Sequence, residues 1–163
     1  MAVEIERKFK VLNDDWRRAV RTSTLLRQGY LANTGRASVR VRLAGDQGWL
    51  SVKAMTRGPA RAEYEAAIAA ADANEMLLAL CEGPVIEKWR HNVRHEGDEW
   101  EIDEFLGLNA GLVIAELELD SVQQQFLAPA WLGAEVTHDE RYYNFSLSRH
   151  PYGRWPENRR SVP

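Results

Sequence analysis

Six pairs of charged side chains are spaced two residues apart along the chain, and both members of each pair carry the same sign. The pairs are Glu4 and Glu6, Arg40 and Arg42, Glu63 and Glu65, Lys88 and Arg90, Glu101 and Asp103, and Glu116 and Glu118. Side chains at i and i+2 of a strand point to one face, so each pair places two charges side by side. Guanidinium and ammonium groups bind phosphate oxygens, whereas carboxylates bind hard cations such as Mg²⁺ and Mn²⁺. This combination favours the binding of a polyanion together with a divalent metal.

Two arrangements of these pairs fit the sequence. In the first, the charges lie on the outer face of a sheet, and opposite signs form cross-strand ion pairs worth about a few tenths of a kcal/mol each. In the second, the charges line the inside of a barrel, and helices and loops cover the apolar faces. Burying many charges without partners is costly, so the second arrangement needs a wide, wet lumen and an ion-rich ligand. Composition alone slightly favours the first arrangement.

The elements that must position these charges are strands with an alternating apolar and charged pattern. Eight strands are expected, at residues 3–11, 24–33, 36–43, 48–55, 61–68, 84–93, 98–105 and 112–120. Helices are expected at residues 16–21, 69–80, 121–127 and 138–149. Most strands are joined by short turns, which implies antiparallel neighbours, and closing the sheet removes its edges. The sequence therefore predicts an α+β, mainly β fold: an eight-stranded antiparallel closed barrel with flanking helices.

Length and composition limit the protein class. A chain of 163 residues fits one domain, and we expect it at residues 1–150, followed by a basic, Pro-rich tail at 151–163. The single cysteine, Cys81, excludes a disulfide framework within the chain and a multi-cysteine zinc site. No apolar run reaches the roughly 20 residues of a membrane span, and the charged N-terminus is unlike a secretory signal. We therefore expect a cytoplasmic protein with no membrane or nucleic-acid partner.

The order of the charged motifs carries a family resemblance. The first strand reads VEIERK, and RVR, SVK, EYE, KWR, EID and ELE follow in that order. This succession resembles the CYTH superfamily, the triphosphate tunnel metalloenzymes. The resemblance covers residues 3–120, and the ending VTHDERYYNFSL is similar to that of short bacterial members.

The resemblance implies a barrel whose lumen is a tunnel with a charged lining. It also implies an enzyme, a metal-dependent triphosphatase that hydrolyses a phosphoanhydride bond of inorganic triphosphate or a related triphosphate. A class IV adenylate cyclase and a thiamine triphosphatase are the alternative activities. A polyphosphate- or nucleotide-binding module is the alternative that is not an enzyme. The expected partner is a small-molecule triphosphate, and the expected assembly is a monomer or a homodimer.

Site roles follow from the resemblance, position by position. The metal ligands, for two Mg²⁺ or Mn²⁺ ions with substrate bound, would be Glu4, Glu6, Asp103, Glu116 and Glu118. The phosphate-binding cations would be Lys8, Arg40, Arg42, Lys53, Lys88 and Arg90. The candidate catalytic groups are Lys8, Tyr30, Lys88 and Glu63. Some roles stay open: Glu63 and Glu65 could form ion pairs or position water or metal, and Tyr30 could be a core residue. The general base is a carboxylate or a lysine of the lumen.

Overall fold

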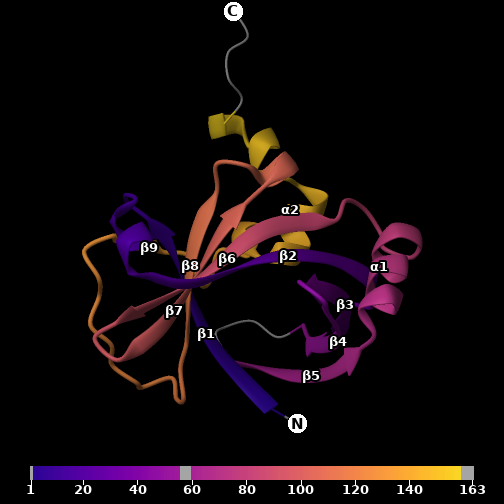
Figure 1. The fold of residues 1–163 in the computed structure, drawn as a ribbon, viewed down its shortest axis with the longest axis horizontal. Helices are drawn as coiled ribbons and strands as arrows, with labels where there is room; N and C mark the ends of the chain where they lie inside the picture. The colour runs from indigo at the N-terminus through magenta and orange to yellow at the C-terminus, as the bar shows by residue number, and fades with distance from the viewer. Residues whose placement is uncertain (1, 56–59, 159–163) are drawn as a thin grey trace, which may run out of the picture.

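Nine antiparallel strands form one continuous sheet in the computed structural model, which describes residues 2–55 and 60–158. The strands are β1 (Ala2–Val11), β2 (Val20–Asn33), β3 (Ala37–Ala44), β4 (Gln47–Ala54), β5 (Ala60–Ile68), β6 (Ile86–His95), β7 (Asp98–Phe105), β8 (Val113–Glu118) and β9 (Leu132–Glu135). Their order is β5-β4-β3-β2-β6-β7-β8-β1-β9 (Figure 1). A further pairing of β5 with β1 closes the first eight strands into a barrel, which confirms the predicted fold.

The ninth strand, β9, pairs with the part of β1 that extends beyond its pairing with β5. One edge of β1 pairs with β8 through residues 6–10. On the other edge, residues 2–5 pair with β5, while Phe9 and Val11 pair with β9. Strand β9 thus occupies the edge of β1 that β5 leaves free. The sequence pattern did not predict β9, because the four residues LGAE show no alternation.

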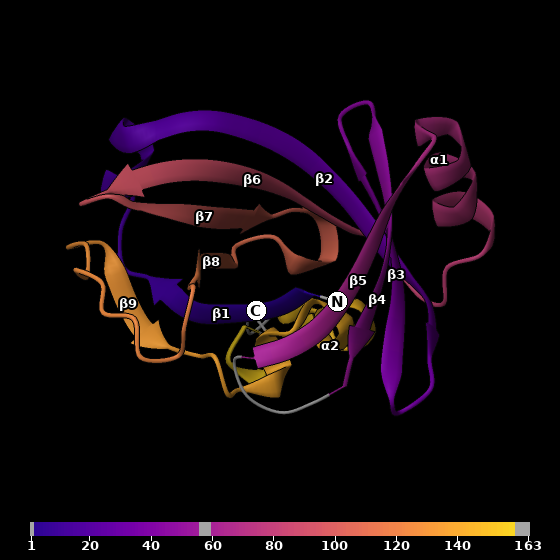
Figure 2. The ribbon, with the colours of Figure 1, turned by 90° about the horizontal axis from the view of Figure 1, so that it is seen from below.

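Helix α1 (Ala70–Ala79) confirms the helix expected at 69–80, and it packs on the outside of β3 and β4 (Figure 2). Its buried residues Ala73 and Leu77 contact Val41 of β3. Gly48 of β4 permits this close approach, because a Cβ atom there would lie 2.8 Å from the Cβ of Ala73.

The other predicted helices are shorter than expected or absent. Residues 15–19 form a 3₁₀ turn, η1 (Asp15–Ala19), after which β2 begins at Val20. Residues 121–127 are not helical, and Phe126 within them packs edge-on against the Phe9 and Trp100 rings. The helix expected at 138–149 is divided into η3 (Glu140–Tyr142) and α2 (Asn144–Arg149) by the extended residue Tyr143, with φ −71° and ψ 138°. Within the described residues, no helix combines the length and apolar composition that a membrane crossing requires.

Residues beyond α2 pack against the barrel. Two 3₁₀ turns, η4 (Tyr152–Arg154) and η5 (Pro156–Asn158), follow α2. The buried Trp155 ring lies edge-on to Tyr142, with 5.1 Å between the ring centroids. Residues 159–163 of the expected tail lie outside the described residues.

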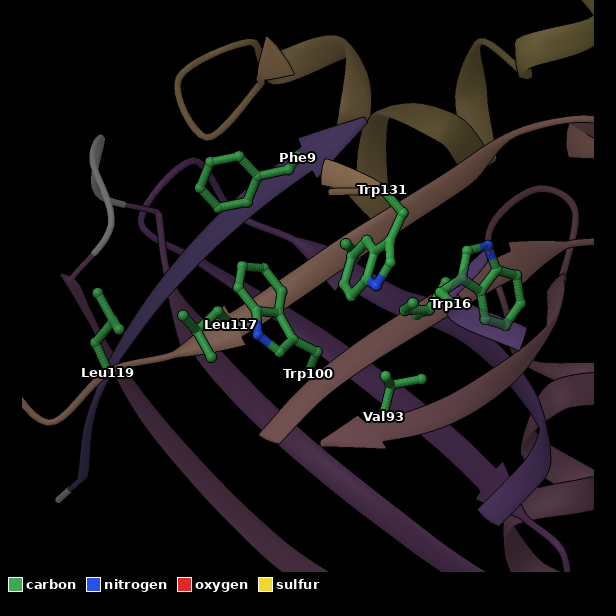
Figure 3. Packing of buried hydrophobic residues seen from close by; sticks show 9 residues of the cluster. Phe9, Trp16, Val93, Trp100, Leu117, Leu119 and Trp131 are labelled. Atoms are coloured by element: carbon green, nitrogen blue, oxygen red, sulfur yellow. The ribbon is translucent and has the colours of Figure 1, made fainter. Parts of the chain in front are cut away.

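The apolar faces of β1, β7 and β8 point outward, away from the lumen. Phe9, Trp100 and Leu117 belong to one buried cluster that also contains Trp16 and Trp131, and these two residues come from segments that cover the strands (Figure 3). The charged faces of the same strands consequently point into the barrel. The second of the two arrangements that fit the sequence is therefore the correct one.

Candidate active site

The inward faces of the strands enclose a cavity of about 640 Å³. Within the described residues, seven cations and eight carboxylates line it. They are Glu4, Glu6, Lys8, Arg40, Arg42, Lys53, Arg61, Glu63, Glu65, Lys88, Arg90, Glu101, Glu116, Glu118 and Glu140. Every predicted site residue except Asp103, including the uncharged Tyr30, lies in this lining. The structure thus brings together residues from all eight predicted strands and from the C-terminal segment.

One end of the lumen is filled by apolar side chains. On β6, β7 and β8 the inward-facing side chains change from charged to apolar toward this end of the barrel. The apolar residues are Ile86, two residues from Lys88; Phe105, two residues from Asp103; and Ile114, two residues from Glu116. Ile86, Phe105 and Ile114 pack with Leu147 of α2 and with Trp155. The C-terminal segment therefore closes this end of the barrel.

Three consecutive residues of this segment each contact a different strand of the barrel. The Tyr143 ring lies 4.4 Å from the guanidinium carbon of Arg61 on β5. The Asn144 Oδ1 atom accepts a hydrogen bond from the Lys88 Nζ atom on β6, at 3.2 Å. The Phe145 ring lies edge-on to Tyr30 on β2, with centroids 5.2 Å apart. The segment thus positions side chains that face the cavity from three walls.

Most of the predicted phosphate-binding cations pair with carboxylates of the lining. Lys8 pairs with both Glu6 and Glu116, and Lys53 pairs with Glu4. Burial alone would lower the pKa of Lys8, but these two carboxylates raise it above its ordinary value. The ammonium group of Lys8 is therefore a persistent positive charge in the cavity.

The two arginines of β3 pair with the carboxylates of β5. An Arg40 terminal nitrogen lies 3.3 Å from a Glu63 oxygen, and an Arg42 terminal nitrogen lies 3.1 Å from a Glu65 oxygen. Glu65 also accepts a 2.7 Å hydrogen bond from the Ser51 hydroxyl on β4, the strand between β3 and β5. Ion pairing is thus the role that Glu63 and Glu65 have in this arrangement.

Asp103 shares the inward face of β7 with Glu101, but it lies deeper along the strand and does not line the cavity. It is fully buried, and it accepts two hydrogen bonds of 2.7 Å from Arg90 and one from Lys88. Burial alone would raise the pKa of Asp103, but Arg90 and Lys88 hold it below its ordinary value. The geometry differs from the expected contact with metal, because both carboxylate oxygens are already bound to the two cations that Asp103 positions.

Glu118 is a carboxylate of the lining that forms no ion pair with another described residue. It lies directly opposite Glu6 in the β1–β8 pairing. Its pKa is raised by burial and by the nearby Glu4, Glu6 and Glu63 carboxylates. Like charges directly opposite each other destabilise a sheet, and a divalent cation would relieve that repulsion.

The oxygen donors of Glu4, Glu6 and Glu118 fit a hard divalent cation. Among the described residues, no three carboxylate, imidazole or thiol groups converge as a complete metal-binding group. Glu4 and Glu6 are instead paired with Lys53 and Lys8, on the same side of the cavity. The donor set fits the expected metal, and these lysines compete with it for the carboxylates.

Arg61, Tyr143 and Asn144 line the cavity but were not predicted from the sequence. Arg61 shares the inward face of β5 with Glu63 and Glu65, so the two-residue period was a usable signal. Tyr143 and Asn144 come from a segment without a strand or helix period, so local pattern offered no signal for them.

The CYTH domain family matches residues 2–152, nearly the whole chain and all of the strands that form the cavity. The chain belongs to the CYTH domain family. An inorganic triphosphatase of Acetivibrio thermocellus is 48% identical over 157 residues, covering 96% of this chain and 100% of the relative. An inorganic triphosphatase of Nitrosomonas europaea is 37% identical over 151 residues, covering 89% of this chain and 96% of the relative.

A solved CYTH-like structure supports the same placement. The crystal structure of an inorganic triphosphatase matches with a TM-score of 0.66 and 34% identity, covering 91% of this chain and 95% of that chain. The family resemblance inferred from the ordered charge pairs is thus confirmed.

Proposed function

We propose that this CYTH domain hydrolyses a phosphoanhydride bond of inorganic triphosphate with the help of a divalent metal. The observation that carries the proposal is the charged lumen, in which cations from five strands lie beside the Glu4, Glu6 and Glu118 carboxylates, and Glu118 has no ion-pair partner among the described residues. The names of the two relatives support the choice of inorganic triphosphate. We also propose a cytoplasmic location and a monomer or homodimer, on the sequence grounds given above.

Glu4, Glu6 and Glu118 are the residues that we assign to the metal, with Glu116 nearby on β8. Mg²⁺ or Mn²⁺ is the ion we expect, as two ions when substrate is bound. Such ions neutralise charge on phosphoryl oxygens and lower the pKa of an attacking water. Lys8 and Lys53 then exchange a carboxylate partner for a phosphate oxygen.

The cations of the lining supply most of the proposed catalytic effect. Phosphoryl transfer depends chiefly on alignment and charge neutralisation, and arginine can bind phosphate through two parallel hydrogen bonds. Lys8 and Lys88 are assigned to phosphate binding in this way. Burial raises the pKa of Tyr30, so its hydroxyl stays neutral and can donate a hydrogen bond. Glu63 is the carboxylate that we keep as the candidate proton acceptor.

We expect inorganic triphosphate to be hydrolysed faster than ATP, and pyrophosphate to be hydrolysed poorly. Three phosphates are long enough to contact cations on several walls, whereas pyrophosphate leaves some cations unpaired and loses alignment. The measurement is kcat/KM for the three compounds at fixed Mg²⁺, with EDTA as the control and with cyclic AMP assayed beside phosphate. Cyclic AMP as the main product, or a preference of about tenfold for ATP or thiamine triphosphate, would reject this substrate assignment.

Binding can be tested without turnover by adding Ca²⁺ and inorganic triphosphate together. At a ligand concentration of about 100 times Kd, the expected gain in unfolding free energy is about 2.7 kcal/mol. For a chain of this length that corresponds to a rise in Tm of roughly 5–10 °C, measured by calorimetry or dye fluorescence. Triphosphate with EDTA is the control. An unchanged Tm at saturating ligand contradicts a ligand-filled lumen.

A further inference from the structure

Arg61 differs from the other cations of the cavity in its partners. Each of the other six forms an ion pair with a carboxylate, as described above. Among the described residues, Arg61 has no carboxylate within ion-pair distance, and its guanidinium lies over the face of the Tyr143 ring. Its side chain is half-buried and lines the cavity. Glu4 lies opposite Arg61 in the β1–β5 pairing but forms its ion pair with Lys53, so Arg61 has no carboxylate partner among the described residues.

The Tyr143 ring holds this guanidinium without using its hydrogen-bond donors. The ring is itself fixed, because the Tyr143 hydroxyl donates a 3.0 Å hydrogen bond to the carbonyl oxygen of Thr137. The Thr137 hydroxyl in turn accepts a 3.0 Å hydrogen bond from the backbone N–H of Lys8 on β1. A cation–π contact uses the charge of the guanidinium rather than a hydrogen bond, so its N–H donors stay available. Arg61 is thus an oriented cation with free donors inside the cavity.

We propose that Arg61 is a specificity-determining residue that binds the second terminal phosphate of inorganic triphosphate. This inference rests on the proposed function. Inorganic triphosphate ends in a terminal phosphoryl group on both sides, whereas a nucleoside triphosphate has one such group and an ester at the other end. An esterified phosphate has fewer ionised oxygens to offer a planar, doubly donating guanidinium. Arg61, which has no carboxylate partner among the described residues, should therefore bind inorganic triphosphate more strongly than ATP.

The test compares Arg61→Gln with Arg18→Gln, which makes the same substitution on the exposed turn η1, outside the cavity lining. In Arg61→Gln we expect kcat/KM for inorganic triphosphate to fall roughly 10- to 100-fold, the cost of a charge-assisted contact. For ATP we expect a fall of at most about threefold, so the ratio between the two substrates shrinks. Arg18→Gln should leave both values unchanged. Equal losses for both substrates, or no loss for inorganic triphosphate, would overturn the proposal.

Two further measurements separate this proposal from folding and from the proposed function. Arg61→Lys keeps the charge but loses the planar fork, so its substrate ratio should lie between those of the wild type and Arg61→Gln; a ratio equal to the wild type's would reject bidentate recognition. The rise in Tm with Ca²⁺ and inorganic triphosphate should be smaller in Arg61→Gln than in Arg18→Gln. This binding comparison decides the role of Arg61 even if the wild type hydrolyses no triphosphate, and equal rises would contradict it.

Discussion

Glu118→Gln should reduce turnover of inorganic triphosphate by about 1,000-fold, because a metal ligand that supplies several kcal/mol of transition-state stabilisation is lost. The same variant should be at least as stable as the wild type. Glu118 faces Glu6 directly across β1 and β8, and no described cation pairs with it. Its removal therefore relieves repulsion and leaves no cation without a partner. Activity and thermal unfolding, measured on the same preparation, check both parts.

The pH dependence of that stability gain has a defined sign. The pKa of Glu118 is raised in the folded protein by burial and by Glu4, Glu6 and Glu63, so its ionised form costs stability at neutral pH. Below the unfolded-state pKa of about 4.3 the carboxyl is protonated in both states, and the difference from Glu118→Gln should vanish. Glu87→Gln, which removes a carboxylate paired with Arg27 and absent from the cavity lining, is the control and should keep full activity. Full activity in Glu118→Gln would place the metal elsewhere.

Asp103→Asn should lower the free energy of unfolding by about 3–5 kcal/mol, the cost of breaking a buried ion pair on one side. Asp103 is fully buried and binds both Lys88 and Arg90, which would keep their charges with a neutral partner. The adjacent Glu104→Gln removes a partly exposed carboxylate that pairs with Arg17, so it should cost at most about 1 kcal/mol. Urea unfolding of both variants with an unchanged m-value is the measurement. Equal, small losses would contradict the role of Asp103 as a buried anchor.

Acid should remove the contribution of Asp103 in the wild type. Its pKa is depressed in the folded state by Arg90 and Lys88, so its stabilisation is present above the unfolded-state pKa of about 3.9. The contribution is lost as the pH falls through the lower folded-state value. The difference in stability between the wild type and Asp103→Asn should therefore narrow under strongly acidic conditions.

Alternation predicted the strands and grouped the charges by face, but it could not say which face points inward. A period of two is unchanged when a strand is turned over, so Glu4 and Glu6 could face the lumen or the solvent. The outcome depends on what covers Phe9 on the opposite face. Phe126 does so, with 5.8 Å between the ring centroids, and it comes from a segment without a strand period. The resemblance to the CYTH superfamily, carried by the order of the charged motifs, indicated that the charged faces point inward.

The sequence also could not predict how far along each strand the cavity lining extends. Glu101 and Asp103 share a face, yet only Glu101 lines the cavity, because the lumen becomes apolar one residue pair beyond Asp103. That boundary is set by Leu147 and Trp155, which are distant in the chain. The extended residue Tyr143 was missed for the same reason: it is held by Arg61 and Thr137 rather than by its own neighbours in sequence.

The near balance of seven cations and eight carboxylates around the described lumen has a kinetic consequence. Long-range attraction of a charged ligand requires a field of one sign, and this cavity presents almost none to an approaching polyanion. Capture should therefore depend only weakly on ionic strength, unlike capture by enzymes that steer anions with a positive surface. A divalent metal reduces the negative charge of triphosphate, so we expect the metal complex to enter this nearly neutral cavity more readily than the free anion. Flux through the enzyme would then follow the supply of free divalent metal in the cell as closely as the supply of triphosphate.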